Sequence, residues 1–474
     1  MAKTTHIAVV SIPIFSHQSS IIEFCKRLIH IHHHIHITCI FPTIGAPIPA
    51  TLKLLESLPS SINYIFLPPI SIKDLPHKNP SLLFLLAVSQ SLPSIHNSLA
   101  SLLCSTSTTP LVALIVDVLA TQALEIAKEF NLFSFLYFPL SAMTMSLLSH
   151  LPTLHEKISC EYKDHTEPIQ LPGCSVPIHG QDLMPNFLQD RSSIVYEITL
   201  QHCKRFSLAH GFLVNSFSKM ENISEHNSQL VYMVGPIIQS GSNSSDETNE
   251  SVCLKWLESQ TPNSVLYVCF GSGGTLFQQQ INELALGLEL SNQKFLWVLR
   301  EPNNSKDVDY QRVKIENDDN DLLKYLPHGF LERTKEQGLV VPLWAPQTKI
   351  LSHTSTGGFL THCGWNSILE SIVLGVPMIT WPLFGEQRMN AVLLTEGLKV
   401  GLKIKFNENG IAEIDEIAKV VRDLMLGEER SGIQQRIEEL KDAAACALAE
   451  DGSSTRALSE FGTRMENLSF QKEI

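Results

Sequence analysis

Clustered cysteines are missing from this 474-residue sequence. Its ten cysteines are scattered without a C-x-x-C pair, so neither a zinc site nor a disulfide framework is indicated. Runs of about 18 apolar residues, which a membrane-spanning helix requires, are missing as well. The first residues hold one lysine and a short apolar run that Pro13 interrupts, unlike a secretory signal peptide. We therefore expect a cytoplasmic protein without a transmembrane segment.

Basic clusters are also missing. The formal charge is 35 − 48 = −13, and no run rich in lysine and arginine occurs, so we expect no nucleic-acid partner and no anionic membrane surface. Hydrophobic residues make up 44% and charged residues 18%, a balance typical of a folded globular protein. A small anionic ligand stays compatible with this charge, because backbone N–H groups can bind phosphate in an acidic protein. We expect a monomer.

Short apolar runs alternate with helical patterns in two series. The first series contains the runs HIAVV, IHITCIF, INYIFL, LVALIV and FSFLYF, and the second contains SVLYVCF, KFLWVL, GLVVPL, GGFLTH and VPMIT. Continuous apolar strands separated by helices indicate parallel sheets covered on both faces, which bind ligands at the carboxyl ends of their strands. The predicted fold class is α/β, with two Rossmann-like doubly wound domains that face each other across a cleft.

A polar stretch, QSGSNSSDETNES, separates the two series. We accordingly predict an N-terminal acceptor-binding domain over 1–240, a linker over 241–252, a C-terminal nucleotide-sugar domain over 253–450, and a C-terminal helix over 451–474 that packs back toward the N-terminal domain. The acidic segment 301–322 is predicted to be a solvated loop.

The most informative segment reads WAPQTKILSHTSTGGFLTHCGWNSILESIVLGVPMITWPLFGEQ. Its centre predicts a strand, a tight turn and a helix, an order that places a helix N-terminus at the carboxyl end of a strand and suits a diphosphate. His362 ends the strand, and Gly364 permits close backbone approach. Asn366 and Ser367 can cap the helix or bind phosphate oxygens. Glu370 lies one turn farther, where its carboxylate can accept from both hydroxyls of a ribose.

This 44-residue segment resembles the UDP-sugar signature of plant family 1 glycosyltransferases, which begins with WAPQ and passes through HCGWNS. Other stretches, such as CEYKDHTEPIQLPGC, LVNSF, VGPII and LPHGFLERTKEQGLVVPLWAPQ, resemble the branch that glucosylates hydroquinone and phenylpropanoid phenols. The resemblance implies a fold of the GT-B type and an inverting UDP-glucosyltransferase that makes β-glucosides of phenylpropanoid, hydroquinone or flavonoid acceptors. UDP-glucose is then a donor substrate, and neither a cofactor nor a metal is expected.

The resemblance also implies a role for each matching residue. Trp344 would stack on uracil, and Glu370 would bind the ribose hydroxyls. The full set of implied UDP contacts is Ser272, Trp344, Ala345, Gln347, His362, Gly364, Asn366, Ser367 and Glu370. The implied sugar contacts are Trp365, Glu386 and Gln387. A glutamine at the last position is associated with glucose, where a histidine would suggest galactose.

Transfer to a phenol needs a base, because a hydroxyl with a pKa of about 10 is a weak nucleophile at neutral pH. His17 follows the first strand, in a loop before a helix expected to start near Ser19, and Asp117 follows the strand LVALIV. Both are therefore expected at the carboxyl edge of the first sheet. In the family, a histidine and an aspartate at these places form the catalytic pair. The acceptor pocket is expected around Ile14, Phe15, Leu119 and Phe384.

Several alternatives stand beside this hypothesis. The family loop reads P-G-x-G-H-x-x-P, whereas residues 13–20 read PIFSHQSS here, which favours as an alternative a non-catalytic nucleotide-sugar-binding module with a degenerate acceptor loop. A serine hydrolase would need G-x-S-x-G, but residues 270–274 lack the first glycine. A metal-dependent transferase would need Asp-x-Asp at a strand end, yet residues 307–309 lie in the acidic segment. Alternation along a strand would separate the histidines of HIHHHIHI at 30–37, so no metal site is predicted there.

Overall fold

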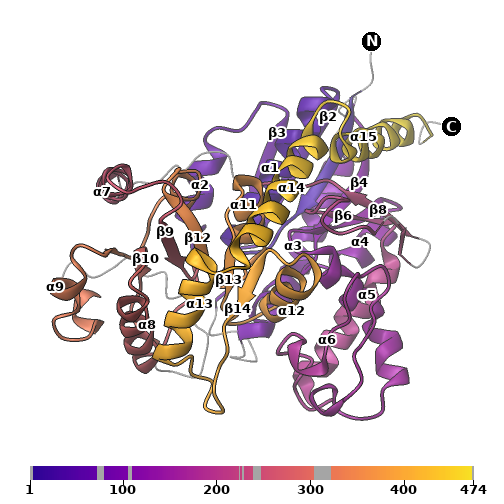
Figure 1. Ribbon diagram of the computed structural model, residues 1–474. Coiled ribbons are helices and arrows are strands. Elements are labelled where there is room, and N and C mark those ends of the chain that lie inside the picture. Colours follow the sequence, from indigo (N-terminus) through magenta and orange to yellow (C-terminus); the bar gives the residue numbers. More distant parts are fainter. Residues whose placement is uncertain are drawn as a thin grey trace. The chain divides into compact units, whose positions relative to one another are not determined.

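Two compact units make up the protein (Figure 1). The first unit contains residues 1–240 and 444–474, and the second contains residues 241–443. The computed structural model describes residues 4–71, 80–104, 109–223, 225–226, 229–238, 247–303 and 322–471. The Asp-x-Asp sequence at 307–309 and most of the predicted acidic loop lie outside these residues.

The first unit is built on an eight-stranded sheet with the order β3-β2-β1-β4-β5-β6-β8-β7. Its pairs are parallel except β7 with β8. The strands are β1 (Thr5–Val10), β2 (Ile35–Phe41), β3 (Ile62–Phe66), β4 (Leu111–Asp117), β5 (Phe133–Phe138), β6 (Gly211–Val214), β7 (Glu225–His226) and β8 (Gln229–Met233). The helices before the second unit are α1 (Phe15–Ile31), α2 (Pro49–Leu55), α3 (Pro80–Cys104), α4 (Ala123–Glu129), α5 (Ala142–Lys157) and α6 (Ile194–Lys204).

The second unit is built on a six-stranded parallel sheet with the order β11-β10-β9-β12-β13-β14. Its strands are β9 (Val265–Cys269), β10 (Lys294–Leu299), β11 (Gly338–Pro342), β12 (Thr356–Thr361), β13 (Met378–Thr380) and β14 (Gly401–Lys403). Its helices are α7 (Glu247–Glu258), α8 (Gln278–Ser291), α9 (Phe330–Thr334), α10 (Gln347–Leu351), α11 (Trp365–Leu374), α12 (Gln387–Val392) and α13 (Ile414–Leu426). Helix α14 (Arg430–Leu448) runs across the boundary between the units.

Strand order explains where each sheet can bind a ligand. In the first sheet the chain proceeds from β1 to β2 on one side and returns to β4 on the other, and in the second sheet β9 lies in the same way between β10 and β12. Such a reversal opens a crevice at the carboxyl ends of the two central strands. The loops after β1, β4, β9 and β12 are therefore the places where binding residues are expected.

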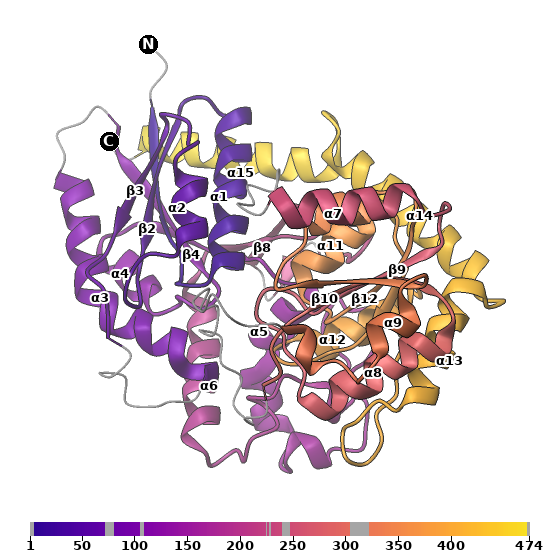
Figure 2. The same cartoon turned by 90° about the vertical axis from the view of Figure 1, so that its left-hand side faces the viewer.

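The C-terminal helix α15 (Ser453–Gln471) completes the core of the first unit (Figure 2). The ring of Phe461 lies 5.0 Å from that of Phe135 on β5 and 5.6 Å from that of Tyr232 on β8, measured between ring centroids. His32, at the end of α1, contacts the carboxylate of Glu466 and the carbonyl oxygen of Ser459. The last helix of the chain thus belongs to the same hydrophobic core as the first strand.

Two local features differ from the sequence-based expectations. Helix α1 begins at Phe15, not near Ser19, because the chain after Pro13 enters helical geometry directly. Helix α7 begins at Glu247, inside the segment predicted to be a linker over 241–252, and Cys253 and Leu257 anchor it in the second unit with no exposed surface. Among the helices of the described residues, none combines the length and apolar character needed to cross a bilayer.

Candidate active site

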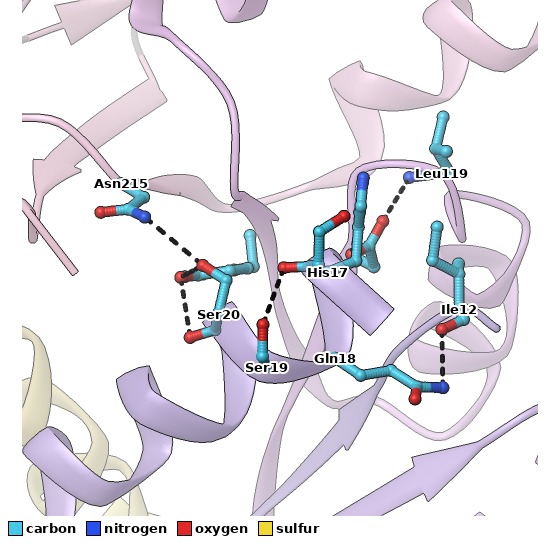
Figure 3. Close-up of polar contacts among 10 residues, drawn as sticks. Ile12, His17, Gln18, Ser19, Ser20, Leu119 and Asn215 are labelled. Atoms are coloured by element: carbon cyan, nitrogen blue, oxygen red, sulfur yellow. Dashed lines mark hydrogen bonds and ion pairs between the residues drawn. The ribbon is translucent and has the colours of Figure 1, made fainter. Parts of the chain in front are cut away.

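A buried histidine–aspartate pair lies at the strand reversal of the first sheet. The Nδ1 atom of His17 is 2.8 Å from Oδ2 of Asp117, and the side chain of Asp117 has no exposed surface. The other carboxylate oxygen of Asp117 accepts a hydrogen bond from the backbone N–H of Leu119 at 2.9 Å (Figure 3). A carboxylate held in this way fixes the histidine tautomer that carries its proton on Nδ1 and its lone pair on Nε2.

His17 and Asp117 are 100 residues apart in the sequence, and the order of the strands explains why they are in contact. Asp117 is the last residue of β4, and His17 lies in the first turn of α1, which follows the neighbouring strand β1. A helical start also directs the side chain of His17 more firmly than the predicted loop would, because its backbone N–H already donates to the carbonyl oxygen of Ile14. The structure therefore brings the predicted pair together.

The backbone of the unusual loop before His17 does not need the family's glycines. Among residues 11–20 none has a positive φ, so no position requires glycine. The side-chain amide of Gln18 donates to the carbonyl oxygen of Ile12 at 2.9 Å (Figure 3). The hydroxyl of Thr51 donates to the other end of the Gln18 amide. Gln18 thus connects the loop to α2, a function that its sequence position alone did not reveal.

The predicted acceptor-pocket residues divide between the two units. Ile14, Phe15 and Leu119 are partly exposed and flank the elements that carry His17 and Asp117. Phe384 belongs to the second unit, where it follows β13.

The signature segment forms a turn around His362 at the strand reversal of the second sheet. A Cβ atom on Gly271 would lie 2.5 Å from the ring of His362, and one on Gly364 would lie 2.4 Å from it. Glycines after β9 and β12 therefore let the backbone enclose the imidazole from two sides. Burial, and secondarily the Arg300 cation, lowers the pKa of His362 to about 4, so the ring is neutral at pH 7.

Helix α11 starts directly after this turn. Its N-cap is Gly364, and no side chain caps it, which differs from the predicted capping by Asn366 or Ser367. Those two residues are the second and third of the helix, so their backbone N–H groups lie in its first turn, where the helix itself offers no acceptor. Trp365 is the first residue, and its side chain is buried. A helix N-terminus with small and polar residues in its first turn suits an anion.

Glu370 on α11 and Gln347 on α10 form a second polar group. The amide nitrogen of Gln347 donates to the Glu370 carboxylate at 2.7 Å and to the hydroxyl of Ser367 at 3.0 Å. Burial raises the pKa of Glu370, and the hydrogen bond from Gln347 opposes that shift. Three predicted UDP-binding residues from α10 and α11 are thus in direct contact.

Trp344 is held beside this group by a residue that the motif did not predict. The side-chain amide of Asn249, on α7, donates to the carbonyl oxygens of Pro342 and Trp344 at 3.3 and 3.2 Å. The indole of Trp344 is partly exposed, whereas Ala345 is buried. Asn249 lies in the segment predicted to be a linker, so its sequence context gave no signal for this contact.

Asn390, just after the signature segment, contacts the turn that follows β12. The side-chain amide of Asn390 donates to the carbonyl oxygen of Cys363 at 3.0 Å and contacts Glu386 at 3.4 Å. The side-chain oxygen of Gln387 accepts from the backbone N–H groups of Leu383 and Phe384 at 2.8 and 2.9 Å. The amide nitrogen is therefore the group through which Gln387 can reach a ligand. Asn390 falls just beyond the signature, which is why the motif did not predict its contact with the turn.

The His-rich segment 30–37 does not assemble ligands. In the described part of the chain, no group of three or more histidine, cysteine, aspartate or glutamate side chains could hold a metal ion. His32 turns toward α15, and His36 lies on β2.

Comparisons with known proteins show the family of this chain. The family described as UDP-glucoronosyl and UDP-glucosyl transferase matches residues 241–423. Hydroquinone glucosyltransferase of Rauvolfia serpentina is 48% identical, over 98% of this chain and 99% of that protein. The chain belongs to this family.

Solved structures of family members are similar over the same length. A UDP-glucosyltransferase from Polygonum tinctorium, capable of glucosylating indoxyl, is 44% identical and gives a TM-score of 0.88 over 98% of this chain and 99% of that one. UGT2 of Phytolacca americana, solved with UDP-2-fluoro-glucose and pterostilbene, is 43% identical. Its TM-score is 0.86, and the match covers 98% of this chain and 100% of that one. The predicted family, the GT-B fold class and the assignment as a UDP-glucosyltransferase are confirmed. The enzyme uses a UDP-sugar donor and a small-molecule acceptor.

Proposed function

We propose that this UDP-glucosyltransferase moves glucose from UDP-glucose to a hydroxyl of a small phenolic acceptor, with inversion at the anomeric carbon. The observation that carries the proposal is the 2.8 Å hydrogen bond between His17 and the buried Asp117 at the strand reversal of the first sheet. The relatives named for hydroquinone and indoxyl support an aromatic hydroxyl acceptor.

His17 and Asp117 act together in the single displacement step of the reaction. Nε2 of His17 takes the proton of the phenolic O–H while the oxygen attacks the anomeric carbon of glucose. The bond from that carbon to the UDP oxygen breaks, and UDP leaves with the electron pair. Because attack comes from the face opposite UDP, an α-linked donor gives a β-glucoside. Asp117 stabilises the imidazolium that forms and keeps the ring oriented.

The second unit holds the leaving group in this proposal. The α11 N-terminus and its residues Asn366 and Ser367 receive the diphosphate, while Glu370 binds the ribose hydroxyls beside Trp344 and the uracil. Glu386 and the amide nitrogen of Gln387 bind the sugar. Since the Trp365 side chain is buried, the sugar would meet its backbone and not its ring.

A panel of phenols incubated with UDP-glucose tests the function. We expect mass spectrometry to show one added hexose on at least one phenol, and the anomeric proton coupling in NMR to show a β linkage. Equal or better use of UDP-galactose would contradict the donor assignment. UDP binding without transfer to any phenol would favour a non-catalytic nucleotide-sugar-binding module instead.

Metal independence is a separate prediction. The helix N-terminus supplies positive potential where a metal-dependent transferase would place a cation, so the initial rate should be unchanged in excess EDTA. Rates measured with EDTA, with added magnesium and with neither should agree. A loss of activity in EDTA that magnesium or manganese restores would overturn this prediction.

A further inference from the structure

Arg300 is a partly buried cation without an anionic partner among the described residues. It follows the last residue of β10, and its guanidinium donates from Nη1 to the carbonyl oxygen of Ser272. Among the described residues, its buried Nε has no hydrogen-bond partner, and no carboxylate contributes to its electrostatic surroundings. The adjacent Glu301 accepts a hydrogen bond from the hydroxyl of Tyr325 instead. A guanidinium whose Nε is buried without a hydrogen-bond acceptor or a counter-charge is costly, which points to a ligand that supplies the negative charge.

The surroundings of Arg300 indicate which ligand this is. Strands β10, β9 and β12 are neighbours in the sheet, and Arg300, Ser272 and His362 follow their respective carboxyl ends. His362 stands directly beside the α11 N-terminus through its contact with Gly364. Arg300 therefore reaches the same turn that is proposed to receive the diphosphate of the donor.

Charge distinguishes Arg300 from the other groups at this turn. The ring of His362 has a buried Nδ1 without a partner and, with its lowered pKa, carries no charge at neutral pH. Asn366, Ser367 and the helix terminus contribute only dipoles. A guanidinium, in contrast, keeps its full charge and presents several N–H donors in a planar fork that matches phosphate oxygens.

We propose that Arg300 is a diphosphate-binding residue of the donor site and neutralises the charge of the UDP leaving group. The proposal rests on the proposed donor site in the second unit. Arg300 lies outside the signature segment, which begins only at Trp344. Through its hydrogen bond to Ser272, the same side chain also fixes the turn after β9.

Binding of three ligands, UDP, UMP and uridine, separates charge recognition from a change in fold. We expect Arg300→Gln to weaken UDP binding by about tenfold or more in calorimetry, because a charge-assisted contact is lost, while uridine binding stays within about twofold of wild type. The penalty for UMP should lie between the two. The matched control is Arg333→Gln, in the same unit, because Arg333 is exposed and already paired with Glu289. This control should bind all three ligands like wild type.

Each other outcome has a definite meaning. An unchanged affinity for UDP, or equal losses for UDP and uridine, would overturn the role of Arg300. If Arg300→Gln does not fold, Arg300→Met decides, because it also removes the charge: weaker UDP binding with normal uridine binding supports the role of Arg300, and wild-type binding of both ligands overturns it. Failure of the wild-type protein to bind UDP would instead contradict the donor site itself.

Discussion

Replacing His17 by alanine should reduce kcat by roughly 10²-fold or more on an ordinary phenol, while the affinity for UDP-glucose changes little. The variant removes the proposed base, whereas the proposed donor-binding residues belong to a different unit of the chain. Steady-state kinetics with both substrates varied, together with calorimetry of UDP, would measure the two effects. The expected result is a loss confined to turnover.

A surface pair offers the matched control. His96 on α3 contacts Glu129 at 3.1 Å, so it is also a histidine–carboxylate pair in the first unit, but both side chains are exposed. His96→Ala should therefore leave kcat unchanged. Asp117→Asn should lower kcat as well, because an amide N–H facing Nδ1 of His17 would favour the tautomer whose Nε2 already carries a proton.

The acidity of the acceptor distinguishes proton removal from positioning. A nitrophenol that is already ionised at the assay pH asks for less proton transfer, so the loss caused by His17→Ala should be smaller for it than for an un-ionised phenol. Equal losses for the two acceptors would assign His17 a positioning role. Near-wild-type turnover of His17→Ala on the un-ionised phenol would refute the proposed base altogether.

Much of this arrangement can be predicted from local sequence patterns. Continuous apolar runs such as LVALIV predict buried parallel strands, and residues that follow such runs must lie at the carboxyl edge of a sheet. That rule is enough to place both His17 and Asp117 at this edge. It does not give the strand order, and only the order shows that β1 and β4 are neighbours. The 2.8 Å contact therefore depends on long-range pairing that local patterns do not encode.

Residues that support the donor site escaped prediction for the same reason. Asn249 and Asn390 act by donating side-chain hydrogen bonds to backbone carbonyls of distant segments, and an asparagine in such a role resembles any polar surface residue in the sequence. Arg300 did carry a signal, because it follows the apolar run KFLWVL directly. The burial of its Nε and the lack of a carboxylate partner among the described residues became visible only in the folded chain.

In both units the candidate binding residues lie at the point where the strand order reverses, but the side chains there suit different chemistry. In each sheet the loops at the strand reversal bring together residues from neighbouring strands, as with His17 and Asp117 in one and Gly271 and His362 in the other. At the first reversal a buried carboxylate holds a histidine, which suits proton transfer. At the second, backbone surrounds a histidine that stays neutral, which suits hydrogen bonding to a bound group more than proton transfer.

Removing the charge of Glu370 should weaken UDP-glucose binding strongly. Hydrogen bonds to charged groups contribute about 1.5–3 kcal/mol, which corresponds to a roughly 10- to 100-fold rise in Kd for Glu370→Gln. The glutamine keeps the size of the side chain and can still accept from Gln347, so the local structure should persist. Calorimetry with UDP and 2′-deoxy-UDP tests the assignment, because the variant should lose less with the ligand that lacks one ribose hydroxyl.

The pH dependence of uridine binding provides a second measure of the same residue. Burial raises the pKa of Glu370, and the ribose hydroxyls need the ionised carboxylate as acceptor, so uridine affinity should rise with pH through that raised pKa. Uridine is used because it has no phosphate that titrates in this range. The Glu370→Gln variant should show a flat profile, and Glu438→Gln, a change on the more exposed face of α14, should follow wild type. A wild-type profile that is flat, or that falls as pH rises, would mean that the ribose is bound by another residue and that Glu370 stabilises only the contact between α10 and α11.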